Sequence, residues 1–323
     1  MNNKCLIIGL GQIGMGYDLG LDISNYVLSH ARGFYLHPNF DLVGGVDSDV
    51  RKCNRFKEVY NLPAYSDITE ALEALSPNII VIATPSDSHL LILDLILQVC
   101  NPQVIICEKP LHNSLEEAIK ILEICDSRQI KLFVNYIRRS DKGAIKVKAM
   151  FEEGIIKQPI KCTAWYSKGL INNGSHLINL LEFWLGDIVD YKVIRNQRLW
   201  NGEDPELDLE INFQKGTAIL LSCWEEYYPH FSIEMLSPSG ILNYMFGGNK
   251  ITWMPSNASL ENPKKDFLNE RCIEIDNDLN SYQLNFINNL SLAIEGKDCN
   301  ISRGEDALRT LRNIFKIIKG DKI

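Results

Sequence analysis

The stretch KCLIIGLGQIG, residues 4–14, decides the fold. Its first half is an apolar run that meets glycine, which is typical of a buried parallel strand. Its second half has the pattern GxGxxG, whose glycines let backbone N–H groups approach a pyrophosphate at the start of a helix. The α/β pattern that follows gives the motif the context it requires. We therefore predict a dinucleotide site that contains Gly9, Leu10, Gly11, Gln12, Ile13 and Gly14.

Similar apolar runs alternate with helical patterns as far as about residue 135. The runs cover residues 41–47, 78–83, 103–107 and 130–135, and the helical patterns cover 49–60, 67–75, 87–99 and 114–127. The last helical pattern begins with Ser114 and has Glu117 three residues later, as in a capping box. This alternation predicts a parallel sheet with helices on both faces, a Rossmann domain.

The pattern changes after about residue 155. Six short strand patterns joined by tight turns lie between residues 159 and 245, and two helical patterns, 279–295 and 303–318, follow them. Turns this short leave no room for crossover helices, so we predict a largely antiparallel sheet. The expected fold is a Rossmann domain over residues 1–137 and an α+β domain over 138–323. As an alternative, the final helix packs back on the first domain.

Composition excludes several classes of protein. The formal net charge is 33 − 41 = −8, and no dense Lys/Arg block is present, so we predict no nucleic-acid partner. The apolar run at 90–97 is interrupted by Asp94 and is too short for a membrane span. The nine cysteines form no CxxC pair, which indicates reduced thiols and no metal site. We expect a cytoplasmic protein.

Asp47 is the acidic residue expected near the end of the second strand. It lies 47 − 14 = 33 residues after Gly14, whereas about 20 is usual, and an insertion around residues 17–31 explains the excess. A carboxylate here accepts ribose hydroxyls and repels a 2′-phosphate, which favours NAD. Arg51 and Lys52 leave NADP as the alternative cofactor, and Asp47 as a simple helix cap is the alternative role.

Four further segments carry a resemblance to a known family. They are ATPSDSH (83–89), CEKPLHNSLEEA (107–118), NYIRRS (135–140) and NNGSH (172–176). In this order they resemble the Gfo/Idh/MocA oxidoreductases, the family of glucose–fructose oxidoreductase and inositol dehydrogenase. The resemblance implies a substrate held between the nicotinamide and the inner face of the second domain's sheet. It also implies a homo-dimer or homo-tetramer and a Lys109–Pro110 bond that is often cis.

The resemblance also implies roles for individual residues. Lys109 would reach the oxygen on the reacting carbon, where an ammonium group stabilises the developing negative charge. The residues expected along the cofactor are Thr84, Pro85, Ser86, His89 and Glu108; those expected at the substrate are Tyr136, Arg138, Asn172, Asn173 and Tyr282. For His89, a role in packing alone is an equal alternative to cofactor contact. We interpret His30, His37, His112 and His230 as structural or surface residues.

His176 is the second candidate catalytic residue. The family usually has Asp-x-x-x-His here, but this chain has Asn172 in the aspartate position, and the acidic residue often found after the histidine is Asn179. We predict that Ser175 caps a helix and that the helix dipole keeps His176 neutral and able to accept a proton. The stripe His176, Asn179 and Glu182 suggests a ligand-facing side, with hydrogen bonding inside the core as the alternative.

The leading hypothesis is an NAD(H)-dependent oxidoreductase that acts on a hydroxyl or ketone of a sugar, cyclitol or nucleotide-linked sugar. GYD at 16–18 suggests, by analogy, surface-polysaccharide sugar biosynthesis. One alternative is an NAD-using glycosidase or epimerase that oxidises its sugar transiently. The other is a catalytically silent NAD-binding sensor or subunit, motivated by Asn172 and Asn179.

Overall fold

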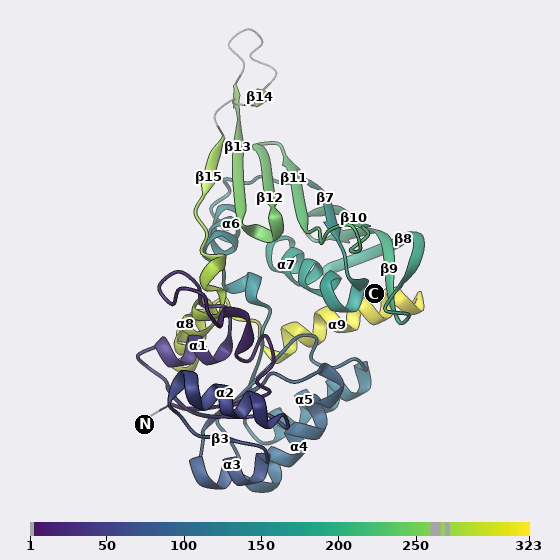
Figure 1. The fold of residues 1–323 in the computed structure, drawn as a ribbon. Coiled ribbons are helices and arrows are strands. Elements are labelled where there is room, and N and C mark those ends of the chain that lie inside the picture. Colours follow the sequence, from purple (N-terminus) through teal and green to yellow (C-terminus); the bar gives the residue numbers. More distant parts are fainter. Residues whose placement is uncertain (1–2, 259–265, 269–271) are drawn as a thin grey trace. The chain divides into compact units, whose positions relative to one another are not determined.

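The computed structural model describes residues 3–258, 266–268 and 272–323, and the chain forms two compact units (Figure 1). The first contains Met1–Ser140 and Asn280–Arg309, and the second contains Asp141–Leu279 and Thr310–Ile323. The predicted domain boundary at 137/138 stays a prediction. The two units are defined by their internal contacts, which do not show whether either part folds by itself.

The first unit is built on a parallel sheet of six strands. In spatial order they are β3 (Ala64–Tyr65), β2 (Asp41–Val46), β1 (Lys4–Ile8), β4 (Ile79–Ile82), β5 (Val104–Cys107) and β6 (Lys131–Val134). The order is that of a Rossmann fold, as predicted. It reverses between β1 and β4, and ligands bind such sheets outside the carboxyl ends of the strands at this switch point.

Helices connect these strands. The connecting helices are α1 (His30–Leu36), α2 (Val50–Tyr60), α3 (Ile68–Leu75), α4 (His89–Val99) and α5 (Leu115–Ser127). A later helix, α8 (Tyr282–Ile294), packs beside α1, and Phe34 and Phe286 share one apolar core with Ile7 and Val81 of the sheet. Because alternate residues of each strand face opposite sides of the sheet, both sides need helices to cover their apolar side chains.

A single turn follows the glycine loop, and the first α-helix begins only at His30. The amides of Met15 and Tyr17 bond to the carbonyls of Gly11 and Gln12, and the next carbonyl, that of Ile13, accepts its bond from His30 at 2.9 Å. Residues 17–29 thus form an excursion of 13 residues, and without it Asp47 would follow Gly14 by 33 − 13 = 20 residues. The excursion lies where the spacing predicts an insertion.

The excursion is organised by the buried carboxylate of Asp18. Its oxygens accept hydrogen bonds from the backbone N–H groups of Leu28 and Ser29, at 2.7 and 2.8 Å, and from the Ser29 hydroxyl. The Arg32 guanidinium donates to the carbonyl oxygens of Asp18, Leu21 and Tyr26. These bonds satisfy backbone groups that a loop of this length would otherwise leave to water.

The second unit is built on a nine-stranded sheet. The strands are β7 (Ile160–Tyr166), β8 (Ile188–Trp200), β9 (Asp204–Phe213), β10 (Gly216–Ser222), β11 (Ser232–Ser237), β12 (Gly240–Met245), β13 (Lys250–Ala258), β14 (Asp266–Leu268) and β15 (Ile273–Ile275). Every neighbouring pair is antiparallel except β7 and β10, which run parallel. The prediction of a largely antiparallel sheet is confirmed.

Two helices cover one face of this sheet, α6 (Lys142–Glu152) and α7 (Ser175–Leu185) (Figure 1). Val147 of α6 and Leu180 of α7 lie in one core cluster with Ala164 of β7. A final helix, α9 (Gly304–Lys319), has its first residues in the first unit and the remainder in the second. No helix in the described part of the chain is long and apolar enough to cross a membrane.

Candidate active site

The glycine loop leaves room for a ligand at one position and none at two others. A Cβ on Gly9, whose φ is +99°, would lie 2.6 Å from the carbonyl oxygen of Ala83, and one on Gly14 would overlap the carbonyl oxygen of Gly9. A Cβ on Gly11 would meet nothing within 4 Å. Gly9 and Gly14 therefore allow close packing of the loop, and Gly11 keeps its backbone open to a bound group.

A cleft of about 610 Å³ lies beside this loop in the first unit. The predicted cofactor residues that line it are Gly9, Gly11, Gln12, Ile13, Asp47, Thr84 and Pro85. They come from the carboxyl ends of β1, β2 and β4, so the cleft lies at the switch point of the sheet. Its open glycine, its polar rim and its volume fit a dinucleotide.

Asp47 is held by groups on three sides. Its Oδ2 accepts a hydrogen bond from the backbone N–H of Leu10 at 2.9 Å and lies 3.1 Å from Nζ of Lys52, which also lines the cleft. Its Oδ1 accepts from the backbone N–H of Asp49, whose own carboxylate lies 2.9 Å from Nη2 of Arg51. The carboxylate predicted to select NAD is therefore partly neutralised by Lys52, the cation that would face a 2′-phosphate.

His89 lies behind the cleft, fully buried. Its Nδ1 is 2.9 Å from the carbonyl oxygen of Leu111 and its Nε2 is 3.0 Å from that of Thr84. Burial lowers the pKa of His89, and the contacts with the carbonyls of Leu111 and Thr84 act against that shift. Its visible role is to connect the loops that follow β4 and β5, and direct contact with the cofactor stays a prediction.

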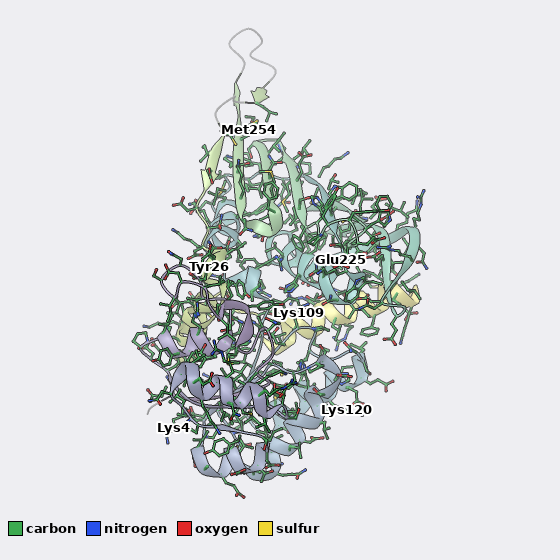
Figure 2. The ribbon with its side chains drawn as sticks, viewed as in Figure 1. Lys4, Tyr26, Lys109, Lys120, Glu225 and Met254 are labelled. Atoms are coloured by element: carbon green, nitrogen blue, oxygen red, sulfur yellow. The ribbon has the colours of Figure 1, made fainter. Side chains whose placement is uncertain are left out.

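Lys109 and Glu108 follow β5 directly, and Lys109 is labelled in Figure 2. The Lys109–Pro110 peptide bond is cis, as the resemblance implies. Oε1 of Glu108 lies 2.7 Å from Nε2 of His30 and 2.6 Å from Nδ2 of Asn135. His30 was expected to be a structural or surface residue without a partner pattern; it is buried and bonded to the motif that carries the candidate lysine.

The predicted substrate residues of the first unit differ in their surroundings. The Tyr282 hydroxyl donates to the carbonyl oxygen of Leu28 at 2.7 Å, and burial raises its pKa, so this side chain fastens the excursion to α8. Tyr136 is buried and Arg138 is half-buried, both just after β6. Substrate contact by these three residues stays a prediction.

In the second unit, a helical turn of π type, Gly169–Gly174, leads into α7. The carboxylate of Asp204, at the start of β9, accepts hydrogen bonds from the backbone N–H groups of Ile171 and Asn172, both at 2.9 Å. The prediction that Ser175 caps the helix is wrong. Ser175 is already helical and its hydroxyl donates to the carbonyl of Asn172, because the helical path starts earlier and Asp204 binds its first N–H groups.

His176 is the second residue of α7 and is 7% exposed. The polar stripe that begins with it does not face a ligand along its length. Asn179 donates to Thr310 at 3.0 Å, and Glu182 accepts from Thr310 and from Asn313, so these groups bond to α9 inside the core. Asn172 and Asn173 are half-buried. Among the described residues, no cluster of His, Cys, Asp or Glu could hold a metal ion.

Sequence reasoning missed His30, Asn135 and Asp204. Each bonds to a residue distant along the chain. His30 and Asn135 lie 78 and 27 residues from their partner Glu108, and Asp204 lies 32 residues from its partner Asn172. One signal was available for His30: once the excursion is removed, it stands in the first helix directly after the glycine loop. For Asp204 the sequence gives no comparable signal.

Comparison with known proteins supports the resemblance. Residues 3–136 match the family model of the Gfo/Idh/MocA proteins, described as an oxidoreductase family with an NAD-binding Rossmann fold. An inositol 2-dehydrogenase from Rubrobacter xylanophilus is 26% identical over 170 residues, which are 52% of this chain and 46% of that protein. The chain thus matches less than half the length of this curated relative.

Solved structures extend the likeness of fold to the whole chain. The WlbA dehydrogenase from Bordetella pertussis, in complex with NADH and UDP-GlcNAcA, superposes with a TM-score of 0.77 at 16% identity, covering 100% of this chain and 97% of that one. The aldose–aldose oxidoreductase from Caulobacter crescentus gives 0.76 at 16%, covering 100% and 99%. Residues 3–136 therefore match the NAD-binding Rossmann fold of the Gfo/Idh/MocA oxidoreductase family, and the likeness to solved structures over the rest of the chain is one of fold.

Proposed function

We propose that the protein is an NAD(H)-dependent oxidoreductase that acts on a hydroxyl or ketone carbon of a sugar, cyclitol or nucleotide-linked sugar. The observation that carries this proposal is the arrangement at the carboxyl edge of the parallel sheet. There the glycine loop after β1, Asp47 after β2 and Lys109 after β5 follow strands that share one edge. Such an edge supplies both a dinucleotide cleft and a cation for the reacting oxygen.

Each residue has a defined part in this reaction. The bound dinucleotide supplies the redox chemistry, as the acceptor or donor of hydride. The Lys109 ammonium donates a hydrogen bond to the substrate oxygen and stabilises the negative charge that develops there. The neutral ring of His176 takes the hydroxyl proton in the oxidation and returns it in the reduction. Asn172 orients the ring or a substrate hydroxyl.

The substrate class is proposed from relatives of known activity. One is named for inositol, another for D-xylose, and the WlbA structure contains UDP-GlcNAcA. All of these ligands carry secondary or anomeric hydroxyl groups. A nucleotide-linked sugar would agree with a role in surface-polysaccharide sugar biosynthesis.

The test begins with the cofactor and ends with turnover. NADH and NADPH are titrated by fluorescence, and then free polyols, aldoses and nucleotide sugars are screened by following the absorbance of the reduced cofactor. Lys109→Met and His176→Gln should each lower kcat by about 10²-fold or more while the Kd for NADH stays within a few-fold. Full turnover in both variants with any substrate found would reject these roles.

A catalytically silent NAD-binding protein is the second candidate, because Asn172 stands where a carboxylate usually assists the histidine. This protein would bind NADH and yet oxidise or reduce none of the sugars screened. Ligand-induced changes in its association with other proteins would then be its readout.

A homo-dimer or homo-tetramer is also part of the proposal. Trp165, Leu236 and Ile273 of the second unit's sheet are exposed apolar side chains, and packing against a second copy would cover them. Light scattering coupled to size-exclusion chromatography measures the oligomeric state.

A further inference from the structure

A buried polar cluster lies beside Lys109, and it is made from three elements of the first unit. His30 is the first residue of α1, Glu108 follows β5 and Asn135 follows β6. The backbone N–H of Asn135 bonds to the carbonyl of Cys107 at 2.9 Å, and that of Glu108 bonds to Ile82 at 3.0 Å. The cluster is therefore fixed to the carboxyl edge of the sheet through the main chain.

Two donors converge on one oxygen of Glu108. Nε2 of His30 and Nδ2 of Asn135 lie 2.7 and 2.6 Å from Oε1, and they lie 3.3 Å from each other. A carboxylate oxygen can accept two hydrogen bonds, and both are charge-assisted. The other oxygen, Oε2, makes neither of these bonds.

The environment of the ring shows which of its nitrogens donates. His30 is 0% exposed, the ring of Phe286 packs near it at 85°, and Nδ1 has no hydrogen-bond partner among the described residues. Nε2 lies 2.7 Å from the Glu108 carboxylate, and a carboxylate oxygen only accepts, so the ring carries a proton on Nε2.

Burial acts to raise the pKa of the Glu108 carboxyl, but the hydrogen bond and the charge of His30, the hydrogen bond from Asn135 and the charge of Lys109 outweigh it, and the pKa is lowered. The other titratable groups whose charges act with Glu108 are His89 on α4, Tyr282 on α8 and Cys107 on β5.

We propose that His30 and Asn135 are positioning residues that hold Glu108 as a fixed anion, so that the adjacent Lys109 stays protonated and correctly placed for the substrate oxygen. The inference rests on the proposed role of Lys109. His30 and Asn135 touch neither cofactor nor substrate in this scheme. They act through Glu108, whose charge favours the ammonium form of its neighbour.

The test separates positioning from simple packing. His30→Gln keeps an N–H donor near the place of Nε2, whereas His30→Leu removes it at similar volume. His37→Gln is the matched control, because His37 directly follows the same helix, is also buried and bonds to Asn288, outside the cluster. For each variant we would measure the melting temperature, the Kd for NADH, and kcat and KM as functions of pH.

The expected result is specific to the donor. His30→Leu should lower kcat by about 10²-fold with KM changed little, and should move the acid limb of the kcat profile upward by about one pH unit as the pKa of Glu108 rises. His30→Gln should recover most of the activity, and His37→Gln should match the wild type. Independently of turnover, histidine ¹⁵N spectra of the wild type should contain an Nε2–H signal that disappears in His30→Gln.

Two results would overturn the inference while leaving the proposed function intact. One is a kcat profile of His30→Leu that matches the wild type while Lys109→Met abolishes turnover. The other is a His30 ring that carries no proton on Nε2 at neutral pH. If instead Lys109→Met turns over normally, the proposed function fails, and the histidine spectra still report whether the cluster exists.

Discussion

The carboxylate of Asp204 accepts a hydrogen bond from the backbone N–H of Asn172 at 2.9 Å, at the start of the helical path that leads to His176. Residue 172 is an asparagine where the resemblance implies an aspartate, yet the carboxylate at the start of β9 holds the main chain of that residue. Gly169 makes this approach possible, because a Cβ there would overlap the carboxylate of Asp204 and its φ is +76°.

Asp204→Asn should destabilise the second unit. The carboxylate accepts from two backbone N–H groups, and an amide oxygen with an NH₂ beside it satisfies one. We expect the free energy of unfolding to fall by about 1–3 kcal/mol in denaturant titrations. Asp190→Asn, at an exposed position of β8, is the control and should change little. Equal effects of the two substitutions would argue against a capping role for Asp204.

Asn172→Asp tests proton handling. A carboxylate at this position would stabilise the His176 imidazolium that the proposed oxidation requires, so kcat near pH 7 should rise by about tenfold or more. The measurement is the pH profile of kcat with a substrate from the screen. Asn196→Asp, at an exposed position of β8, adds the same charge elsewhere and should have no effect. A flat response to Asn172→Asp would favour the silent NAD-binding protein.

Asp47→Ala should change cofactor preference. The substitution removes the carboxylate predicted to accept ribose hydroxyls and frees Lys52 from its ion pair, so that its ammonium could pair with a 2′-phosphate. We expect the ratio of the Kd values for NADPH and NADH to fall by about tenfold or more, as measured by fluorescence titration. Adding Lys52→Ala should reverse part of the change; if the double variant keeps the full shift, Lys52 is not the group responsible.

Asp141→Asn should alter the pH dependence of stability. Asp141 caps α6 and also accepts from the backbone N–H of Asp278, and burial raises its pKa to about 6. The folded carboxyl therefore holds its proton at a higher pH than the unfolded one, whose pKa is about 3.9. Stability from this group is complete below about pH 4 and is lost as the pH rises through about 6.

In the Asp141→Asn variant that decline, on the order of 2 kcal/mol between about pH 4 and 7, should be smaller. Urea titrations at several pH values measure it. Asparagine is also a good N-cap, so the helix itself is retained. If the unfolding free energy of the variant depends on pH as it does in the wild type, the pKa of Asp141 is not raised.

Asp18→Asn should loosen the excursion and leave the glycine loop in place. One of the three hydrogen bonds to the carboxylate, from Leu28 N, Ser29 N or Ser29 Oγ, and the ion pair with Arg32 are lost. We expect a loss of about 2–4 kcal/mol in unfolding free energy, together with faster proteolysis within residues 17–29. Asp22→Asn, at an exposed site of the same segment, serves for comparison.

Sequence patterns predicted the helices and strands correctly where these depend on neighbouring residues in the chain. The runs before Gly9 and Glu108, the capping box at Ser114 and the turn-rich second half predicted the main strands and helices. Short or partly polar elements were missed: β3, α1, α6 and β13 had no distinct pattern. Interactions distant in sequence were also missed, because no local pattern indicates that His30 meets Glu108 or that Asp204 meets Asn172.

Ser175 shows how a correct local rule can fail. A serine before an apolar helix is a good cap by its own chemistry, but the carboxylate of Asp204 already binds the N–H groups upstream of it. The prediction that the polar stripe His176, Asn179 and Glu182 faces a ligand was wrong for a similar reason. Asn179 and Glu182 look exposed to a ligand on a helical wheel, whereas Thr310 and Asn313 of a distant helix occupy that face.

The hydrogen bonds that join the two ends of the excursion have a consequence for how the chain can be changed. Because the carbonyls of Ile13 and Gly14 accept the bonds of His30 and Ala31, the excursion leaves the glycine loop and returns to it at a single point. We therefore expect residues 17–29 to behave as a cassette, whose length can be altered without moving the glycine loop, α1 or Asp47.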